Sequence, residues 1–152
     1  MAGSFGTSSI AEYNVVKDIP AAKALTNEWP TKIVFTPFEA GVAVNYPASS
    51  IENDFKWTQA HPVVEAYKYY LPMPYDRPTW DLIALLYVTE NSPKYFTLSG
   101  WGNVSVDDRG FTTFTPNVNG KHIYLTLTNT QANEIKSHFV ELVSKTPKNY
   151  QK

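Results

Sequence analysis

The chain has 152 residues, of which 43% are hydrophobic and 18% charged, and its formal net charge at pH 7 is −1. This length and composition are typical of one folded domain and exclude an intrinsically disordered chain, so we predict a single domain over residues 1–152. The small net charge gives no electrostatic basis for binding nucleic acid or an acidic membrane surface, and we predict neither partner. The absence of cysteine excludes disulfides and thiolate metal sites.

No apolar run in the sequence has the length that a bilayer-spanning helix needs. The first ten residues, MAGSFGTSSI, lack the charged and apolar regions of a signal peptide. The sequence therefore leaves the cellular compartment open.

The first half of the chain alternates predicted helices and strands. Asp18 as N-cap and Pro20 in the first turn predict a helix over 18–29, and a β-branched and aromatic run predicts a strand over 31–36. The alternating segment 38–44 is interpreted as a second strand. Two short helices and a proline-rich connection are predicted next, at 49–57, 62–71 and 73–78. A helix followed directly by a strand favours an α/β protein.

The stretch YDRPTWDLIALLYV, at residues 75–88, has apolar residues all around a helix. That pattern predicts a helix that is buried on every side. Asp81 lies in its first turn, where a carboxylate complements the helix dipole. An acid at this position can also be an oxygen ligand for a hard cation, and both interpretations stay open.

After residue 91 the pattern changes to short alternating segments. They predict antiparallel strands at 95–100, 103–108, 110–115 and 121–127. Asp107 and Asp108 are interpreted as part of a solvated hairpin turn. An amphipathic helix is predicted over 129–145.

Few residues have spacings that indicate chemistry. His61, His122 and His138 lack the spacing of a zinc helix, and we predict a turn position for the first and surface or interfacial positions for the others. No serine-nucleophile elbow and no phosphate-binding lysine loop is present. In AEYN, Glu12 and Asn14 occupy alternate positions, which point the same way in an extended backbone and would clamp a diol. The alternative is an exposed turn before the next helix.

Together these motifs resemble a known family. The elements MAGSFG, AEYNVVKDIPAAKAL and EWPTKIVF, followed in order by RPTWDLIALLYV, resemble the C-terminal half of inosine–uridine-type nucleoside hydrolases. The resemblance covers residues 1–88 and continues weakly through VSVDDRGFTTF. It implies part of an open, mostly parallel α/β sheet with flanking helices, followed by an antiparallel β-rich section and a closing helix. It also implies cleavage of the N-glycosidic bond of ribonucleosides by a Ca²⁺-bound water.

Residue by residue, the resemblance implies specific roles. Asp81 corresponds to a Ca²⁺ ligand that also contacts the ribose. Glu12 and Asn14 correspond to residues that bind ribose hydroxyls, and Met1 to a methionine that lines the ribose pocket. Many members carry a histidine at the position of Trp80, whereas the purine-preferring branch resembles this chain in having a tryptophan there. An indole could stack on a purine base. The asparagine of the family's glycine loop has no counterpart in GSFGTSSI.

The family's N-terminal Asp-rich motif, which supplies most of the calcium ligands and the catalytic base, is not found in this sequence. We therefore interpret the chain as a C-terminal half without a catalytic residue of its own. We expect it neither to bind Ca²⁺ tightly nor to hydrolyse nucleosides unaided. An incomplete sheet leaves an open edge and apolar helix faces, so we expect a homo-oligomer or association with the missing N-terminal half.

A second hypothesis belongs to a different functional class. The chain could be a non-catalytic binding or structural module that keeps the fold. In that case the tyrosines of its middle section, which look exposed, would serve stacking or partner contacts. They are Tyr67, Tyr69, Tyr70 and Tyr75.

Overall fold

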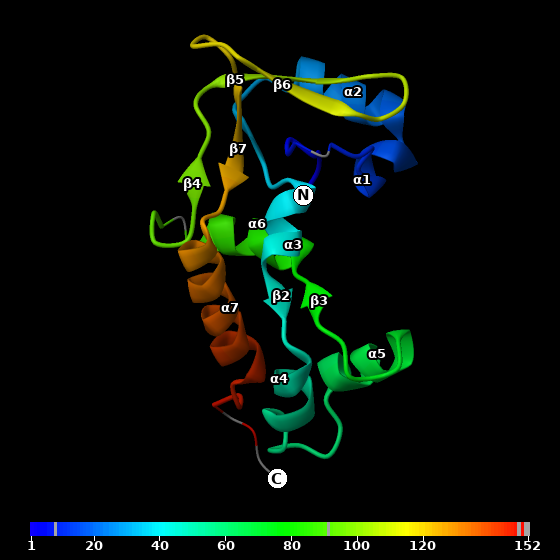
Figure 1. Cartoon of the computed structure of the whole chain (residues 1–152), viewed down its shortest axis with the longest axis vertical. Coiled ribbons are helices and arrows are strands. Elements are labelled where there is room, and N and C mark those ends of the chain that lie inside the picture. The colour runs from blue at the N-terminus through cyan, green and yellow to red at the C-terminus, as the bar shows by residue number, and fades with distance from the viewer. Residues whose placement is uncertain (8, 91, 149, 151–152) are drawn as a thin grey trace.

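The computed structural model describes residues 1–7, 9–90, 92–148 and 150. Within them the chain is an α/β protein with seven helices, an open mixed five-stranded sheet and a small antiparallel two-stranded sheet (Figure 1). The helices are α1 (Tyr13–Lys17), α2 (Ile19–Glu28), α3 (Phe38–Ala43), α4 (Ala48–Asn53), α5 (Pro62–Tyr70), α6 (Trp80–Thr89) and α7 (Asn129–Ser144). The strands are β1 (Ile33–Phe35), β2 (Asn45–Tyr46), β3 (Arg77–Pro78), β4 (Thr97–Leu98), β5 (Gly102–Val106), β6 (Thr112–Pro116) and β7 (His122–Thr126).

The larger sheet has the order β1-β7-β5-β6, and β4 also pairs with β7. β1 and β7 run parallel, with Ile33 opposite His122, whereas the other pairs are antiparallel. A short connection joins β5 to β6, and such a connection produces antiparallel neighbours. The predicted α/β class is confirmed, but the described sheet is mixed, where the resemblance implied a mostly parallel one. The β-rich section also shares its sheet with β1.

Most of the predicted elements are confirmed. Asp18 caps α2 by accepting a hydrogen bond from the backbone N–H of Ala21 at 2.9 Å. The strand predicted over 38–44 is wrong, because most of that segment is the helix α3. Pro37 precedes this helix, and Glu39 lies in its first turn, where the helix dipole favours an acid.

The hydrophobic core lies between the sheet and helices α3, α4, α6 and α7. Helix α6 contributes Ile83 and Leu86, which are 0% and 3% exposed. The prediction that this helix is buried on every side is wrong, because Leu85 and Val88 are 59% and 79% exposed. Asp81 is also exposed and lies on the same face, since residues i, i+4 and i+7 of a helix line one side.

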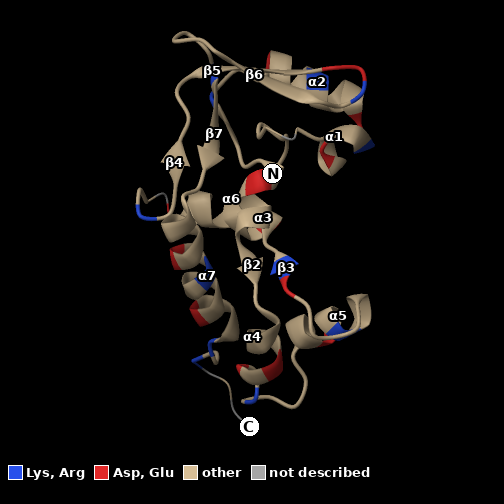
Figure 2. Cartoon of the chain, in the orientation of Figure 1, with Lys and Arg blue, Asp and Glu red and all other residues tan. Residues whose placement is uncertain are grey.

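The connection between β5 and β6 is the predicted solvated turn. Asp107 accepts hydrogen bonds from the backbone N–H groups of Arg109 and Phe111, at 2.8 and 2.9 Å. Gly110 has a φ of 83°, which favours glycine. Acidic and basic residues are interspersed over the described elements (Figure 2). No helix in the described part of the chain is both long and apolar enough to cross a membrane.

Candidate functional site

The N-terminal segment lies beside the short connection between β1 and α3. The backbone N–H of Ala2 donates to the carbonyl of Thr36 at 3.3 Å, and that of Phe38 donates to the carbonyl of Gly3 at 2.8 Å. The side-chain amide of Asn14 donates to the carbonyl of Met1 at 3.2 Å. Two of the residues that the sequence singled out, Met1 and Asn14, are therefore in direct contact.

Glu12 is a buried carboxylate at the start of α1. Its Oε1 accepts a hydrogen bond from the backbone N–H of Asn14 at 3.0 Å, which caps the helix. The residue is only 1% exposed, and its Oε2 is buried without a hydrogen-bond partner among the described residues. A buried polar atom without a partner costs free energy, so it marks a place where a water molecule or a ligand group would be bound.

Both sequence-based interpretations of AEYN need correction. An exposed turn is wrong for Glu12, because the residue is buried. A shared direction of alternate side chains is also wrong, because Asn14 is helical and exposed whereas Glu12 is the buried N-cap. The helix begins one residue after Glu12, and the strand periodicity on which that prediction rested does not apply within a helix.

Trp80 opens α6 and packs against α3. Its ring stacks on Phe38, with a centroid distance of 5.8 Å and an interplanar angle of 28°. A Cβ at Gly41 would lie 2.1 Å from Cδ1 of Trp80, so only glycine allows this approach. Just before Trp80, the backbone N–H and Oγ1 of Thr79 donate to the carbonyl of Val44 at 3.1 and 2.8 Å. The indole Nε1 is buried without a partner in the described structure.

These contacts link the two sequence motifs through α3. The N-terminal segment is hydrogen-bonded to Phe38, and Phe38 stacks on Trp80. Figure 1 shows the N-terminus at one end of α3, where α6 also crosses it. Asp81 follows Trp80 directly, but its side chain is exposed in the first turn of α6.

Glu39 is a residue that the sequence analysis did not single out. Its Oε1 accepts hydrogen bonds from Ser4 Oγ at 2.5 Å and from the backbone N–H of Gly6 at 2.9 Å. Its Oε2 is buried without a partner among the described residues. The signal was an acid two residues after a proline that ends a strand, which is typical of a helix start. The strand interpretation of 38–44 concealed it.

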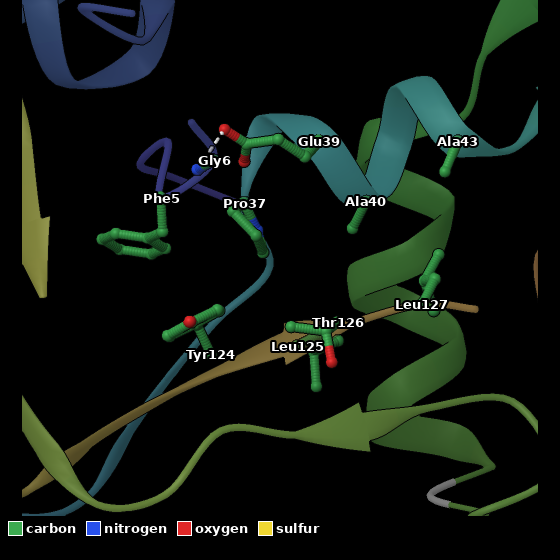
Figure 3. A pocket seen from close by; sticks show the side chains of 10 residues that line it. All are labelled: Phe5, Gly6, Pro37, Glu39, Ala40, Ala43, Tyr124, Leu125, Thr126 and Leu127. Atoms are coloured by element: carbon green, nitrogen blue, oxygen red, sulfur yellow. Dashed lines mark hydrogen bonds between the residues drawn. The ribbon is translucent and has the colours of Figure 1, made fainter. Parts of the chain in front are cut away.

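A cavity of about 230 Å³ lies beside Glu39. Apart from the carboxylate, its lining is largely apolar (Figure 3). The lining residues are Phe5, Gly6, Pro37, Glu39, Ala40, Ala43, Tyr124, Leu125, Thr126 and Leu127. A second, more open cavity of about 800 Å³ shares Phe5, Gly6 and Tyr124 with the first and extends along β6. The loop that Glu39 holds therefore borders both cavities.

The described residues contain no group of three or more His, Asp or Glu side chains that could hold a metal ion. Ca²⁺ takes roughly six to eight oxygen ligands. Asp81, the ligand implied by the resemblance, supplies at most two carboxylate oxygens. The described residues do not fit a Ca²⁺ site.

The histidines have structural surroundings. His61 is the N-cap of α5, accepting from the backbone N–H of Val63 at 3.3 Å, as a turn position predicts. The surface or interfacial position predicted for His122 is wrong, because it is 6% exposed within the sheet. His138 is half-buried, and its Nε2 lies 2.9 Å from a carboxylate oxygen of Glu90.

The candidate site thus consists of two segments, one at the N-terminus and one at the start of α6, joined by α3. Comparisons of the chain with protein-family models and with curated proteins found no match. The case for a function therefore rests on the contacts of these residues.

Proposed function

We propose that the chain supplies the sugar- and base-contacting part of a nucleoside-hydrolase-type site, with purine ribonucleosides as substrates. The observation that carries this proposal is the carboxylate of Glu12, which is buried and has one oxygen without a partner. Ribose is uncharged and has neighbouring hydroxyl groups. A hydroxyl that donates a hydrogen bond to a carboxylate forms a strong, charge-assisted interaction. Oε2 is enclosed in the described structure and Glu12 lines neither cavity, so a ribose hydroxyl would reach and satisfy this atom only once the segment that covers it moves.

The neighbouring residues support the same assignment. The amide of Asn14 can hydrogen-bond a second hydroxyl, and Met1 offers an apolar side chain beside it. Trp80 provides an aromatic surface for the base, and its contact with Phe38 keeps the indole plane in place. In this proposal the exposed carboxylate of Asp81 also contacts the ribose.

Cleavage of the N-glycosidic bond leaves positive charge on the sugar ring, and carboxylates near the ring stabilise that charge. Glu12 and Asp81 are the acids that this chain would contribute. The water-activating groups belong to the Asp-rich motif that this sequence lacks. We propose that a second chain or an upstream segment supplies them, and that the chain by itself does not hydrolyse nucleosides.

Isothermal titration of the chain with inosine tests the proposal. The key variant is Glu12→Gln, which keeps the size of the side chain and an Oε1 that can cap α1, but removes the charge and one acceptor. We expect it to bind inosine roughly tenfold more weakly than the unaltered chain, the effect of losing a hydrogen bond to a charged group. Glu28→Gln, at an exposed position in the last turn of α2, is the matched control. Equal affinity of Glu12→Gln and the unaltered chain would refute the assignment.

The non-catalytic module remains the second candidate, and one observation favours it. Tyr69 and Tyr70 on α5 are 94% and 58% exposed, and the guanidinium of Arg77 lies 4.0 Å from the ring centroid of Tyr70. Exposed tyrosines are typical of partner-binding surfaces. The expected exposure is wrong for Tyr67 and Tyr75, which are half-buried and stack on each other. If the chain binds no nucleoside, a Tyr69→Ser variant that loses binding to a partner protein would favour the module.

A further inference from the structure

Glu39 is the contact point between α3 and the loop of residues 4–7 and 9–10. Its Oε1 receives both the hydroxyl of Ser4 and the backbone N–H of Gly6. The fit around this carboxylate is close, because a Cβ at Gly6 would lie 3.0 Å from Oε1 of Glu39. Figure 3 shows the carboxylate directed from α3 toward Gly6. The loop is thus held by a side chain of the helix that also packs against Trp80.

Ser4 extends this contact to the far end of the loop. It is 0% exposed, and its Oγ accepts a hydrogen bond from the backbone N–H of Ile10 at 3.2 Å. Its carbonyl accepts from Ser9 Oγ at 3.3 Å and from Thr112 Oγ1 at 3.1 Å. Ile10 precedes Glu12 by two residues. The series from Glu39 through Ser4 to Ile10 therefore ends two residues before Glu12 in the chain.

The charge of Glu39 strengthens this arrangement. Burial raises the pKa of the carboxyl group, but hydrogen bonds from the Ser4 hydroxyl and from the backbone N–H groups of Glu39, Gly6 and Phe5 outweigh burial. The net pKa is lower than the ordinary value of 4.5, so the group is ionised at neutral pH. Hydrogen bonds to an ionised acceptor are roughly twice as strong as those between neutral groups.

We propose that Glu39 is a positioning residue for ligand binding: through Ser4 and Gly6 it holds the loop of residues 4–7 and 9–10, and so places Glu12 and the N-terminal segment. The inference rests on the proposed ribose site. Glu39 does not itself contact the ligand in this account. Its effect reaches the site through the backbone of the loop.

Three variants of the full chain test the inference, with inosine affinity and the backbone amide NMR signals of Ile10 and Glu12 as readouts. Glu39→Ala removes the acceptor, and we expect roughly tenfold to hundredfold weaker inosine binding, the size of effect that a misplaced site residue has. Glu39→Gln keeps an oxygen for Ser4 and Gly6, so we expect it to restore most of the affinity. Ser4→Ala removes the partner hydroxyl, and we expect its effect and that of Glu39→Ala to be less than additive, since both break the same link.

Glu65→Ala is the matched control, because Glu65 also lies in the first turn of a helix but on the distant α5, and we expect it to leave both readouts unchanged. If Glu39→Ala unfolds the chain, the inosine affinities of Ser4→Ala and Glu39→Gln are compared instead. Weaker binding by Ser4→Ala than by Glu39→Gln supports the positioning role, and equal, unchanged binding by both overturns it. Unchanged inosine affinity and amide signals in Glu39→Ala and Ser4→Ala would overturn the positioning role while leaving the ribose site intact. If the unaltered chain binds no inosine, the proposed function fails, and unshifted amides of Ile10 and Glu12 would then overturn the positioning role separately.

Discussion

His122 shows how a buried polar residue can be fully engaged in structure. Its Nδ1 accepts a hydrogen bond from the backbone N–H of Val104 at 2.7 Å, which joins β7 to β5. Burial lowers the pKa of the imidazole below its ordinary value of 6.5, with a smaller effect in the same direction from Lys121, whereas a hydrogen bond to the backbone of Thr26 raises it. The ring is therefore neutral at pH 7 and serves as an acceptor.

This lowered pKa predicts a pH-dependent stability. In the unfolded chain the imidazole takes up a proton at a higher pH than in the folded chain, so the free energy of unfolding falls as the pH drops below about 6.5. The loss is complete once the pH is below the folded-state pKa. Urea unfolding measured at about pH 7.5 and about pH 5.5 checks this, with His122→Asn as the variant that keeps an acceptor without titrating. An equal pH dependence in both proteins would contradict the assignment.

Glu12 and Glu39 differ from His122, because each has a carboxylate oxygen that is buried without a partner in the described structure. The sequence predicted Glu12 as a site residue, but from an extended geometry that is wrong. For Glu39 the sequence carried only the signal of a helix start, because the hydrogen bonds that define its role come from a loop more than thirty residues earlier. Burial and partners of this kind depend on tertiary contacts, which local patterns do not report.

At the scale of elements, most helices and strands follow local patterns, but helix α1 and the short strands β2 and β3 were not predicted, and α3 was predicted as a strand. Asp18 predicted α2, and the alternating residues after 91 predicted β5, β6 and β7. Helix α3 was predicted as a strand because its apolar residues alternate with Glu39, Gly41 and Ala43. This segment is short, and its helical state is supported by packing against α6, which a local pattern cannot reveal.

Gly41 provides a test of the packing between α3 and α6. Because a Cβ there would lie 2.1 Å from Trp80 and 2.8 Å from its Cα, Gly41→Ala forces the two helices apart. We expect the free energy of unfolding to fall by about 1–3 kcal/mol, the usual cost of overpacking. Gly100→Ala is the control, since a Cβ at Gly100 has no neighbour within 4 Å. Urea denaturation of both variants checks the prediction, and equal stabilities would contradict it.

Helix α7 offers a second test at this scale. Thr128 and Gln131 form a reciprocal capping box at its start, and Ile135 and Phe139 are its buried residues in the core. We expect Thr128→Ala to lower the free energy of unfolding by about 1 kcal/mol. Thermal unfolding of this variant is compared with that of Thr130→Ala, at an exposed position in the first turn. A larger loss in the control than in Thr128→Ala would refute the capping role.

At the scale of the whole molecule, the long-range pairing of β1 with β7 joins the two halves of the sequence. The α/β class followed from the order of the elements, but this parallel pair did not, because nothing in either segment specifies its partner. The sheet is also open, and the exposed face of α6 carries Leu85 and Val88. Open sheet edges and exposed apolar side chains favour association.

We therefore expect the chain to form a dimer or a larger assembly. Replacing Leu85 and Val88 by serine removes apolar surface from α6 without touching the buried residues Ile83 and Leu86. Sedimentation velocity should show an oligomer for the unaltered chain and a shift toward monomer for the double variant. A clean monomer for the unaltered chain would contradict this prediction.

We propose that the N-terminal segment and the start of α6 form one ribonucleoside site around Glu12. An NMR titration of the ¹⁵N-labelled chain with inosine tests this proposal, because chemical shifts report weak binding residue by residue. We expect shifts that concentrate on the backbone amides of Glu12 and Asn14 and on the indole N–H of Trp80, and that are lost in Glu12→Gln. Signals of these residues that stay unmoved while inosine is in large excess would contradict it.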